Sequence, residues 1–255
     1  MIPTETILGV RFFNGPSREA VDVISQTGGM VVAPAAPSMV NLCYDEDYRA
    51  AVTNAEFAIA DSGWMVLLWK LFTGRGVVRI SGLEYMKRLL EHETVRQTNS
   101  VMWVVPSANA RNKLVDLLRG RGIPAAPENI YIAPKYARPV RDEVLLDKVR
   151  HYRPQHVVIA VGGGIQDKLG RYLKERLDYR PAIHCIGAAL GFLTGDQITI
   201  PDWADRFYLG WLFRTFAQPR IFIPRFWSAR ELPFLIFRYR DQLPPLEKLE
   251  SRNRK

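Results

Sequence analysis

Short apolar runs alternate with helically spaced stretches through the first 195 residues. The runs are rich in β-branched residues, and they predict strands at residues 7–12, 30–33, 57–60, 101–105, 129–132, 156–161 and 182–186. Helical patterns lie between them, such as Tyr48, Ala51, Val52 and Ala55 at i, i+3, i+4 and i+7. This alternation predicts an α/β fold in which helices cover both faces of a mostly parallel, Rossmann-like sheet.

Polar residues and prolines mark where elements should begin and end. Asp45 and Ser107 precede two of the helical patterns and are expected to be their N-caps. After Gly195 the strand signals stop, and helix signals interrupted by prolines follow. We therefore predict an α/β body at residues 1–195 and a helical appendage at residues 196–255, with a disordered tail at its end.

The appendage concentrates the charge and the aromatic rings of the chain. Residues 206–255 hold eleven Lys or Arg against four Asp or Glu, which is +7 of the net charge of +9, and eleven of the 28 aromatic residues. Basic side chains are attracted to anionic surfaces, and aromatic rings settle at the level of lipid headgroups. The segment therefore predicts binding to an anionic membrane surface or another polyanion. The alternative is a solvated basic tail with some core aromatics.

Several classes of protein are disfavoured by the composition. Cys43 and Cys185 form no metal-ligand spacing and no disulfide framework, which favours a reducing compartment, and the four histidines match no metal motif. We see no helix-turn-helix, RNP-like motif or zinc finger, so we expect no nucleic-acid partner. The N-terminus lacks the pattern of an export signal, and the longest run of large apolar residues, 64–69, is far shorter than the ~20 that a spanning helix needs. We expect a cytoplasmic protein that lies peripherally on the inner face of the membrane.

A glycine turn is the first stretch that could carry chemistry. Gly162, Gly163 and Gly164 follow a predicted strand, and Gln166 stands in the helix that should open next. Backbone N–H groups at a helix N-terminus attract anions, and glycines let a phosphate come close to the backbone. The sequence matches neither a dinucleotide fingerprint nor a P-loop, so it predicts a phosphate or sugar-nucleotide site without naming the nucleotide. The alternative is that the glycines only shape the turn.

Asp61 and Arg79 are the second set of candidates. Asp61 follows a predicted strand and precedes an apolar helix, and ligands of open α/β sheets bind beyond the carboxyl ends of strands. We therefore consider Asp61 a general base, against the alternative that Asp61 or Ser62 only caps the helix. Arg79 precedes a Ser-Gly turn and could clamp a phosphate, or it could pair with a surface carboxylate.

Taken in order, these pieces resemble the WecG/TagA/CpsF family of bacterial glycosyltransferases over roughly residues 30–225. The resemblance rests on Asp61 closing a strand, on RISG at 79–82, on the glycine turn with QDK at 166–168, and on four later phrases: IGAALGFLTG (186–195), IPDW (200–203), LGWLFR (209–214) and QPR (218–220). It implies a metal-independent, inverting enzyme without a cofactor. Such an enzyme moves a sugar from a UDP-sugar to an undecaprenyl-diphosphate-linked saccharide, in cell-surface polysaccharide synthesis, at the cytoplasmic membrane face.

The resemblance also implies roles for single residues. Asp61 would be the catalytic base. Arg79, the glycine turn, Gln166 and Gly187 would bind the donor and its phosphates, and no residue would hold a metal. The acceptor diphosphate and the membrane would be met by arginines of the appendage, namely Arg206, Arg214, Arg220 and Arg225.

The chain departs from the family pattern at several polar positions. Ala33 and Ala35 replace a Thr and an Asn, Gly191 replaces an Asp, and Gly210 replaces a Glu; Ser62 also stands in place of a Gly. These departures leave altered specificity and lost catalysis both open, so a sugar-nucleotide-binding homologue is one alternative. A peripheral-membrane scaffold that recruits partners through residues 206–255 is another. The sequence leaves the donor sugar, the acceptor and homo-oligomer formation open.

Overall fold

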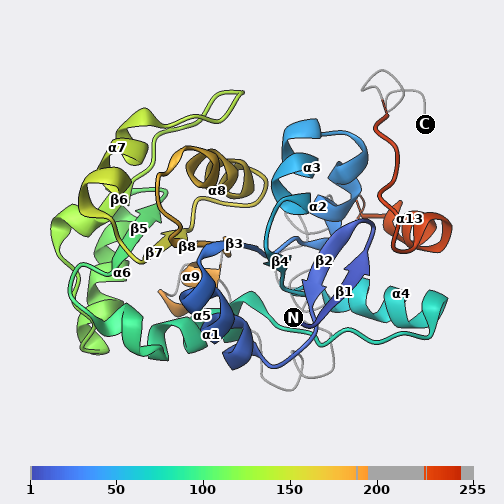
Figure 1. Ribbon diagram of the computed structural model, residues 1–255, viewed down its shortest axis with the longest axis horizontal. Helices are drawn as coiled ribbons and strands as arrows, with labels where there is room; N and C mark the ends of the chain where they lie inside the picture. The colour runs from blue at the N-terminus through green and yellow to red at the C-terminus, as the bar shows by residue number, and fades with distance from the viewer. Residues whose placement is uncertain (1, 188, 195–226, 228, 248–255) are drawn as a thin grey trace.

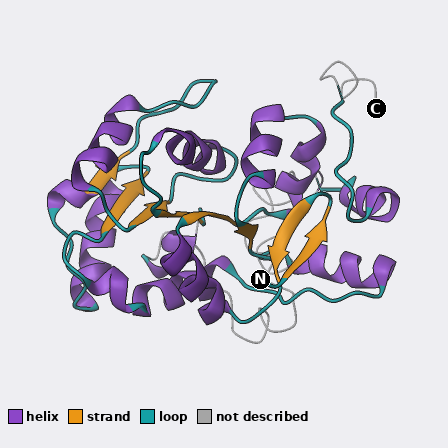
Figure 2. Ribbon diagram, in the orientation of Figure 1, coloured by secondary structure: helices purple, strands orange, loops and turns teal. Residues whose placement is uncertain are grey.

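The computed structural model describes residues 2–187, 189–194, 227 and 229–247. One eight-stranded sheet runs through the molecule in the order β1-β2-β4-β3-β8-β7-β5-β6 (Figures 1 and 2). All its pairings are parallel except β1 with β2, which confirms the predicted mostly parallel α/β fold. The strands are β1 (Thr4–Ile7), β2 (Val10–Phe13), β3 (Gly29–Val32), β4 (Phe57–Ala58), β5 (Val101–Val105), β6 (Ile130–Ile132), β7 (His156–Ile159) and β8 (Ala182–Cys185).

Helices cover both faces of this sheet (Figure 1). One face carries α1 (Ser17–Thr27), α5 (Gly82–Glu91), α6 (Ala108–Gly120) and α9 (Ala189–Leu193). The other carries α2 (Ala36–Val40), α3 (Glu46–Thr53), α4 (Gly63–Thr73), α7 (Glu143–Tyr152), α8 (Ile165–Arg176) and α13 (Leu232–Tyr239). Short 3-10 turns lie at Asn41–Cys43, Glu93–Arg96 and Pro127–Asn129.

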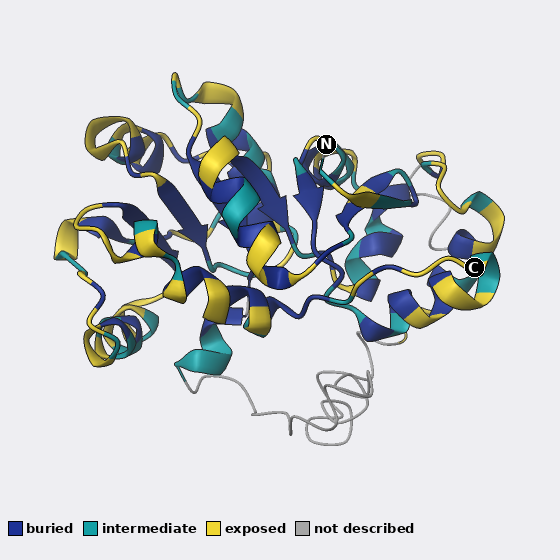
Figure 3. Ribbon diagram, turned by 60° about the horizontal axis from the view of Figure 1, so that its bottom comes forward, coloured by how far each residue is buried: buried dark blue, intermediate teal, exposed yellow. Residues whose placement is uncertain are grey.

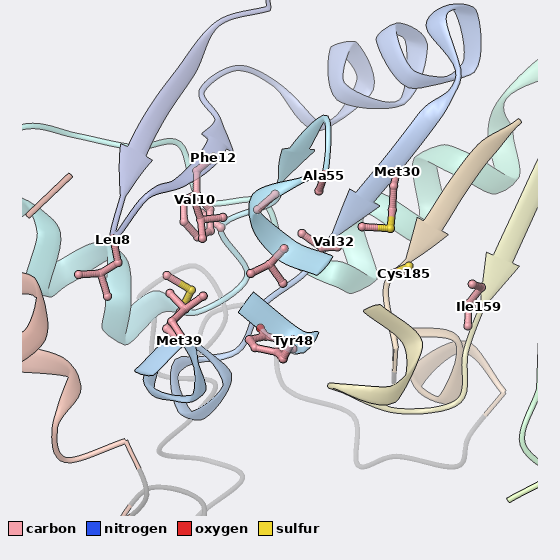
Figure 4. Close-up of a cluster of buried hydrophobic side chains, with 14 of the residues drawn as sticks. Leu8, Val10, Phe12, Met30, Val32, Met39, Tyr48, Ala55, Ile159 and Cys185 are labelled. Carbon is pink, nitrogen blue, oxygen red and sulfur yellow. The ribbon is translucent and has the colours of Figure 1, made fainter. Parts of the chain in front are cut away.

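The core lies between the sheet and its two helical layers (Figure 3). Strands β3, β5, β7 and β8 are buried at every residue, as expected for parallel strands covered on both sides. The α8 helix lies close against β3 and β8 because Gly170 has no side chain there. A Cβ at Gly170 would lie 2.9 Å from Met30 Sδ and closer still to Cys185 Sγ; Figure 4 shows both sulfur-bearing side chains in the core.

The prediction of a single first strand at residues 7–12 was wrong. The chain instead forms a hairpin of β1 and β2, turning at Leu8 (φ 50°) and Gly9 (φ 77°). Two consecutive residues with positive φ form the tight hairpin turn that matches the twist of antiparallel strands. Leu8 is an unusual residue there, but it is fully buried and its N–H donates to the carbonyl of Arg240 at 2.7 Å. A contact with the C-terminal part of the chain thus supports a turn that local pattern did not indicate.

The predicted helix starts are confirmed. Asp45 accepts a hydrogen bond from the Tyr48 N–H at 3.0 Å and caps α3. Ser107 accepts from the Ala110 N–H at 3.2 Å and caps α6. Each cap satisfies a backbone donor that the helix itself leaves unpaired. The carboxyl edge of the sheet therefore carries the helix N-termini in the places that the sequence indicated.

The C-terminal part of the described chain is attached to the body. In α13, Leu232 and Ile236 are fully buried in the core. Beyond it, the Gly9 N–H donates to the Asp241 carbonyl, and the Glu247 N–H donates to the Cys43 carbonyl. The predicted division at residue 195 stays a prediction, because 195–226 and 248–255 lie outside the described residues. Within the described part, no helix is both long and apolar enough to cross a bilayer.

A line of hydrogen bonds joins three buried or partly buried histidines. The Tyr85 hydroxyl lies 2.9 Å from His184 Nδ1, and His184 Nε2 lies 3.1 Å from His156 Nδ1. His156 Nε2 then meets the Thr94 hydroxyl at 2.7 Å, which in turn meets His92 Nδ1 at 2.7 Å. Burial, reinforced by the neighbouring His92, lowers the pKa of His156 from 6.5 to about 4. Burial also lowers the pKa of His184 well below its ordinary value. Both imidazoles are therefore neutral in the folded protein near pH 7.

Candidate active site

A cleft lies where the sheet changes its direction of winding. From β5 the chain passes through α6 to the edge strand β6, whereas from β7 it passes through α8 to β8 on the other side. Open α/β sheets bind ligands at such a switch point, beyond the carboxyl ends of the strands. The cleft has a volume of about 300 Å³, and it is lined by Pro106, Ser107, Asn109, Ala110, Ala160, Val161, Gly162, Gly187, Leu190, Gly191 and Thr194.

The predicted glycine turn meets this cleft through Gly162, which is one of its lining residues. Gly162 and Gly164 have φ values of 106° and 83°, a region that side-chain-bearing residues rarely adopt. Gly164 is the N-cap residue of α8, so the turn delivers the chain directly to a helix N-terminus. A Cβ at Gly162 or Gly164 would meet no atom within 4 Å, which means that these glycines are required by backbone conformation and face open space. The partly exposed turn thus lies at the positive end of a helix.

Asp167 holds the glycine turn in place from below. It is only 3% exposed, and its Oδ2 accepts a hydrogen bond from the Gly164 N–H at 3.0 Å. Burial raises the pKa of Asp167 from 3.8 to about 7, although hydrogen bonds from backbone N–H groups and the nearby Lys168 act in the opposite direction. The carboxyl is therefore only partly ionised at neutral pH. This weakens the repulsion that a full negative charge would exert on an anion bound at the turn.

Gln166 connects the glycine turn to the end of β8. Its Nε2 donates to the Cys185 carbonyl at 3.1 Å, and its Oε1 has no hydrogen-bond partner within the described residues. The side chain lies against Gly187, where a Cβ would be 2.9 Å from that oxygen and where φ is 55°. Gln166 is not among the lining residues of the cleft, but Gly187 is. The structure thus brings together the turn, Gln166 and Gly187, and leaves one buried amide oxygen able to accept a hydrogen bond.

Asp61 and Arg79 lie together beyond the end of β4. Ala60 forms a parallel bridge with Arg79, and Arg79 Nε donates to the Asp61 carbonyl at 3.3 Å. The half-buried Asp61 carboxylate accepts the N–H of Gly82, the first residue of α5, at 2.8 Å. Ser62, not Asp61, caps α4, since its hydroxyl accepts the Met65 N–H at 3.3 Å. Ser62 is therefore the residue that caps α4, and the Asp61 carboxylate is oriented by α5 instead.

Gly82 links the two groups of candidates. A Cβ there would lie 3.2 Å from Ala189 Cβ, 3.8 Å from the Ile186 carbonyl oxygen and 3.9 Å from Asp61 Oδ1. Asp61 is therefore separated from the end of β8 by little more than one glycine. Because β4 and β7 are three strands apart, Asp61 and the glycine turn lie roughly 14 Å from each other along the edge. An elongated ligand with a phosphate group could span that distance.

The structure does not test the predicted roles of the appendage arginines. Arg206, Arg214, Arg220 and Arg225 lie outside the described residues, so their predicted roles remain predictions. Lys168, which follows the glycine turn in α8, is paired with Asp45 at 2.6 Å.

A family model described as the glycosyl transferase WecG/TagA/CpsF family matches residues 5–248. The chain belongs to this family. A search of curated proteins gave no match. Members of the WecG/TagA/CpsF family are glycosyltransferases, and the matched range contains every candidate described above. The cleft at the switch point and the Asp61 carboxylate are therefore the candidate site of a glycosyltransferase.

Within the WecG/TagA/CpsF frame, one departure falls inside the cleft. Gly191, where the resemblance leads us to expect an aspartate, is one of the lining residues. Ala33 and Ala35 lie just beyond β3, and Ala35 is the N-cap residue of α2 without a side-chain cap. Among the described residues the cleft wall thus carries no carboxylate, and Ala33 and Ala35 leave two polar side chains of the family pattern absent near β3.

Some lining residues were not identified from the sequence as site residues. Ser107 was recognised only as a helix cap, while Asn109 and Thr194 were not singled out. The available signal was a polar residue directly after a buried strand, at Ser107. Its meaning depends on β5 and β7 being neighbours at the switch point, which only the strand order reveals.

Proposed function

We propose that this chain is an inverting glycosyltransferase that needs no metal ion. It would transfer a sugar from a UDP-sugar to a polyprenyl-diphosphate-linked saccharide in cell-surface polysaccharide synthesis, at the inner face of the membrane. The observation that carries the proposal is the position of Asp61. Its carboxylate is held at the N-terminus of α5, on the same sheet edge as the glycine-walled cleft at the switch point.

In this reaction Asp61 accepts the proton of the acceptor hydroxyl as that oxygen attacks the anomeric carbon of the donor. A new carbon–oxygen bond forms on one face, the bond to UDP breaks on the other, and the configuration inverts. Negative charge grows on the departing diphosphate. It is stabilised by the backbone N–H groups at the start of α8 and by the Arg79 guanidinium, which are fixed before the reaction begins.

The donor would lie along the carboxyl edge. Its nucleotide occupies the cleft between the ends of β5 and β7, its diphosphate faces the glycine turn, and its sugar points toward Gly82 and Asp61. Gln166 packs against Gly187, which lines the cleft, and would therefore orient the donor by fixing the end of β8 at that point. The roughly 14 Å between turn and base suits a ligand of this elongated kind.

A donor screen tests the proposal. Purified protein and a short-chain lipid-diphosphate sugar are incubated with a panel of UDP-sugars, and UDP release is measured. Asp61→Asn should lower transfer ~100- to 10,000-fold and leave UDP-sugar binding nearly intact, because only the proton acceptor is lost. Asp147→Asn is the matched control, since Asp147 is an exposed carboxylate of α7. Wild-type turnover in the Asp61 variant would remove this residue from the mechanism.

A sugar-nucleotide-binding homologue without catalysis is the second candidate, and Gly191 in the cleft wall favours it. It predicts UDP-sugar binding by calorimetry without release of UDP from any donor. Gly191→Asp, alone or with Ala33→Thr and Ala35→Asn, would then create activity in a silent protein. In an adapted enzyme the same changes should lower activity on its own substrate, because polar groups would be buried without partners.

A further inference from the structure

Exposed hydrophobic side chains gather on two helices that are far apart in sequence. On α4, Leu67 is 44% exposed and Leu71 is 75% exposed. Before and within α13, Trp227, Phe234 and Phe237 are 66%, 64% and 59% exposed. Large apolar side chains at this density on a protein surface mark a site of interaction, whereas single exposed residues need no explanation.

The two helices form one continuous surface. They pack against each other at one end of the molecule (Figure 1), and the rings of Phe72 and Phe237 meet edge to face with centroids 5.6 Å apart. We call this surface the α4–α13 face; it consists of Leu67, Leu71, Phe72, Phe234 and Phe237.

Apart from Phe72, which packs partly against the core, the residues of this face point away from it. In α4 the opposite side supplies Met65, Leu68 and Trp69 to the core, and in α13 Leu235 and Ile236 do the same. Both helices are thus apolar on their inner and their outer sides. A helix with apolar side chains on both sides is normally covered on both sides. Water alone does not provide such a cover for the outer side.

Positive charges outnumber negative charges around the face. Five exposed cations lie on or beside the two helices: Lys70, Arg75, Arg230, Arg238 and Arg240. Residues 63–75 contain no acidic residue. Of the nearby carboxylates, Glu231 accepts a hydrogen bond from the Tyr44 hydroxyl at 2.8 Å, and Glu5 pairs with Arg75 at 3.1 Å. Asp241 is exposed just beyond α13. The surface therefore combines aromatic rings with a surplus of basic charge.

This combination decides between two occupants. In a symmetric dimer the same patch would meet itself, and its cations would face their own copies. An anionic bilayer offers opposite charge to the cations and an interface in which aromatic rings are favoured. Each Lys or Arg near such a surface strengthens binding about fivefold.

We propose that the α4–α13 face lies on an anionic bilayer, with Leu67, Leu71, Phe234 and Phe237 at the level of the lipid headgroups. The inference assigns this contact to a helix of the α/β body as well as to the C-terminal part. It rests on the proposed function in one respect. Because α4 begins at Gly63, two residues after Asp61, the face places the candidate base beside the surface that carries a lipid-linked acceptor.

Vesicle co-sedimentation tests the proposal with the full-length protein. Wild type should bind vesicles of phosphatidylglycerol and phosphatidylcholine, and bind pure phosphatidylcholine weakly. Leu71→Glu with Phe234→Glu should weaken binding to the anionic vesicles at least tenfold. Val144→Glu is the matched control: Val144 is 61% exposed but belongs to α7, at the other end of the molecule. It should bind like wild type.

Three further measurements keep the outcome clear. Circular dichroism and the unfolding midpoint show whether the double variant is folded. If it is not, Arg238→Gln with Arg240→Gln replaces it, and this variant should bind anionic vesicles roughly 25-fold more weakly than wild type. Equal binding of wild type and folded variants to anionic vesicles would overturn the proposal, as would a dimer that the double variant abolishes without a change in vesicle binding. UDP release with a water-soluble acceptor tests the enzyme separately, since it should survive loss of the bilayer contact.

Discussion

Acid should destabilise this protein through His156, and the size of the effect follows from its surroundings. His156 is fully buried, lies against His184 and meets the Thr94 hydroxyl. Its pKa falls from 6.5 to about 4 on folding. Between these values the unfolded chain binds more protons than the folded one, so the free energy of unfolding decreases as the pH falls through this window. The loss amounts to about 2 kcal/mol at pH 5 and approaches about 3 kcal/mol below pH 4.

Measuring the unfolding free energy of wild type across this pH range would not isolate the contribution of His156. Burial raises the pKa of Asp167 from 3.8 to about 7, so between these values the folded chain binds the extra proton. Its contribution is present at low pH and is lost as the pH rises, which opposes the histidine effect. The useful quantity is therefore the difference in unfolding free energy between wild type and His156→Gln, because Asp167 and the buried His184 contribute to both.

Urea unfolding at pH 7.5, 6.5, 5.5 and 5.0 measures that difference. Wild type should lose about 2 kcal/mol relative to His156→Gln between pH 7.5 and pH 5.0. His151→Gln, at a largely exposed position near the end of α7, is the control and should follow wild type at every pH. A difference that stays constant within about 0.5 kcal/mol would refute the assignment of a low pKa to His156.

Four shorter predictions follow from the site and the core. Gly170→Ala should lower the unfolding free energy by about 1–3 kcal/mol, since its Cβ would overlap the sulfur atoms of β3 and β8, and a thermal melt measures the loss. Gly187→Ala should weaken UDP-sugar binding in calorimetry, because φ is positive there and the added carbon would meet Gln166; unchanged affinity would argue against a donor site at that point. EDTA should leave UDP release unchanged, and strict dependence on added Mg²⁺ or Mn²⁺ would contradict the metal-independent mechanism. Raising salt from 0.1 M to 1 M shortens the Debye length from ~10 Å to ~3 Å, so only part of the protein should leave anionic vesicles; complete release would exclude an aromatic contribution.

Local signals in the sequence predicted the repeating units of this fold well. The strands β5, β7 and β8 are continuous apolar runs in the sequence. The caps at Asp45 and Ser107 are hydrogen bonds to N–H groups only three residues further along the chain. These features depend on contacts a few residues apart. They can therefore be predicted without knowing how the rest of the chain folds.

Features set by distant contacts were less accessible. The turn at Leu8 depends on the Arg240 carbonyl, more than two hundred residues away, and the anchoring of Asp61 depends on the Gly82 N–H. The cleft at Ser107 exists because β5 and β7 are neighbours although β6 lies between them in sequence. Strand order is a property of the folded sheet, and no local pattern encodes it.

The docking of residues 229–247 onto the body changes what a C-terminal truncation would mean. Because residues 229–247 are fixed to the fold through α13 and through backbone hydrogen bonds, they are not a free C-terminal end. Cutting everything after residue 195 would remove Leu232, Leu235 and Ile236 from the core. At about 1.5–3 kcal/mol for each side chain, this loss is comparable with the whole stability of a typical domain.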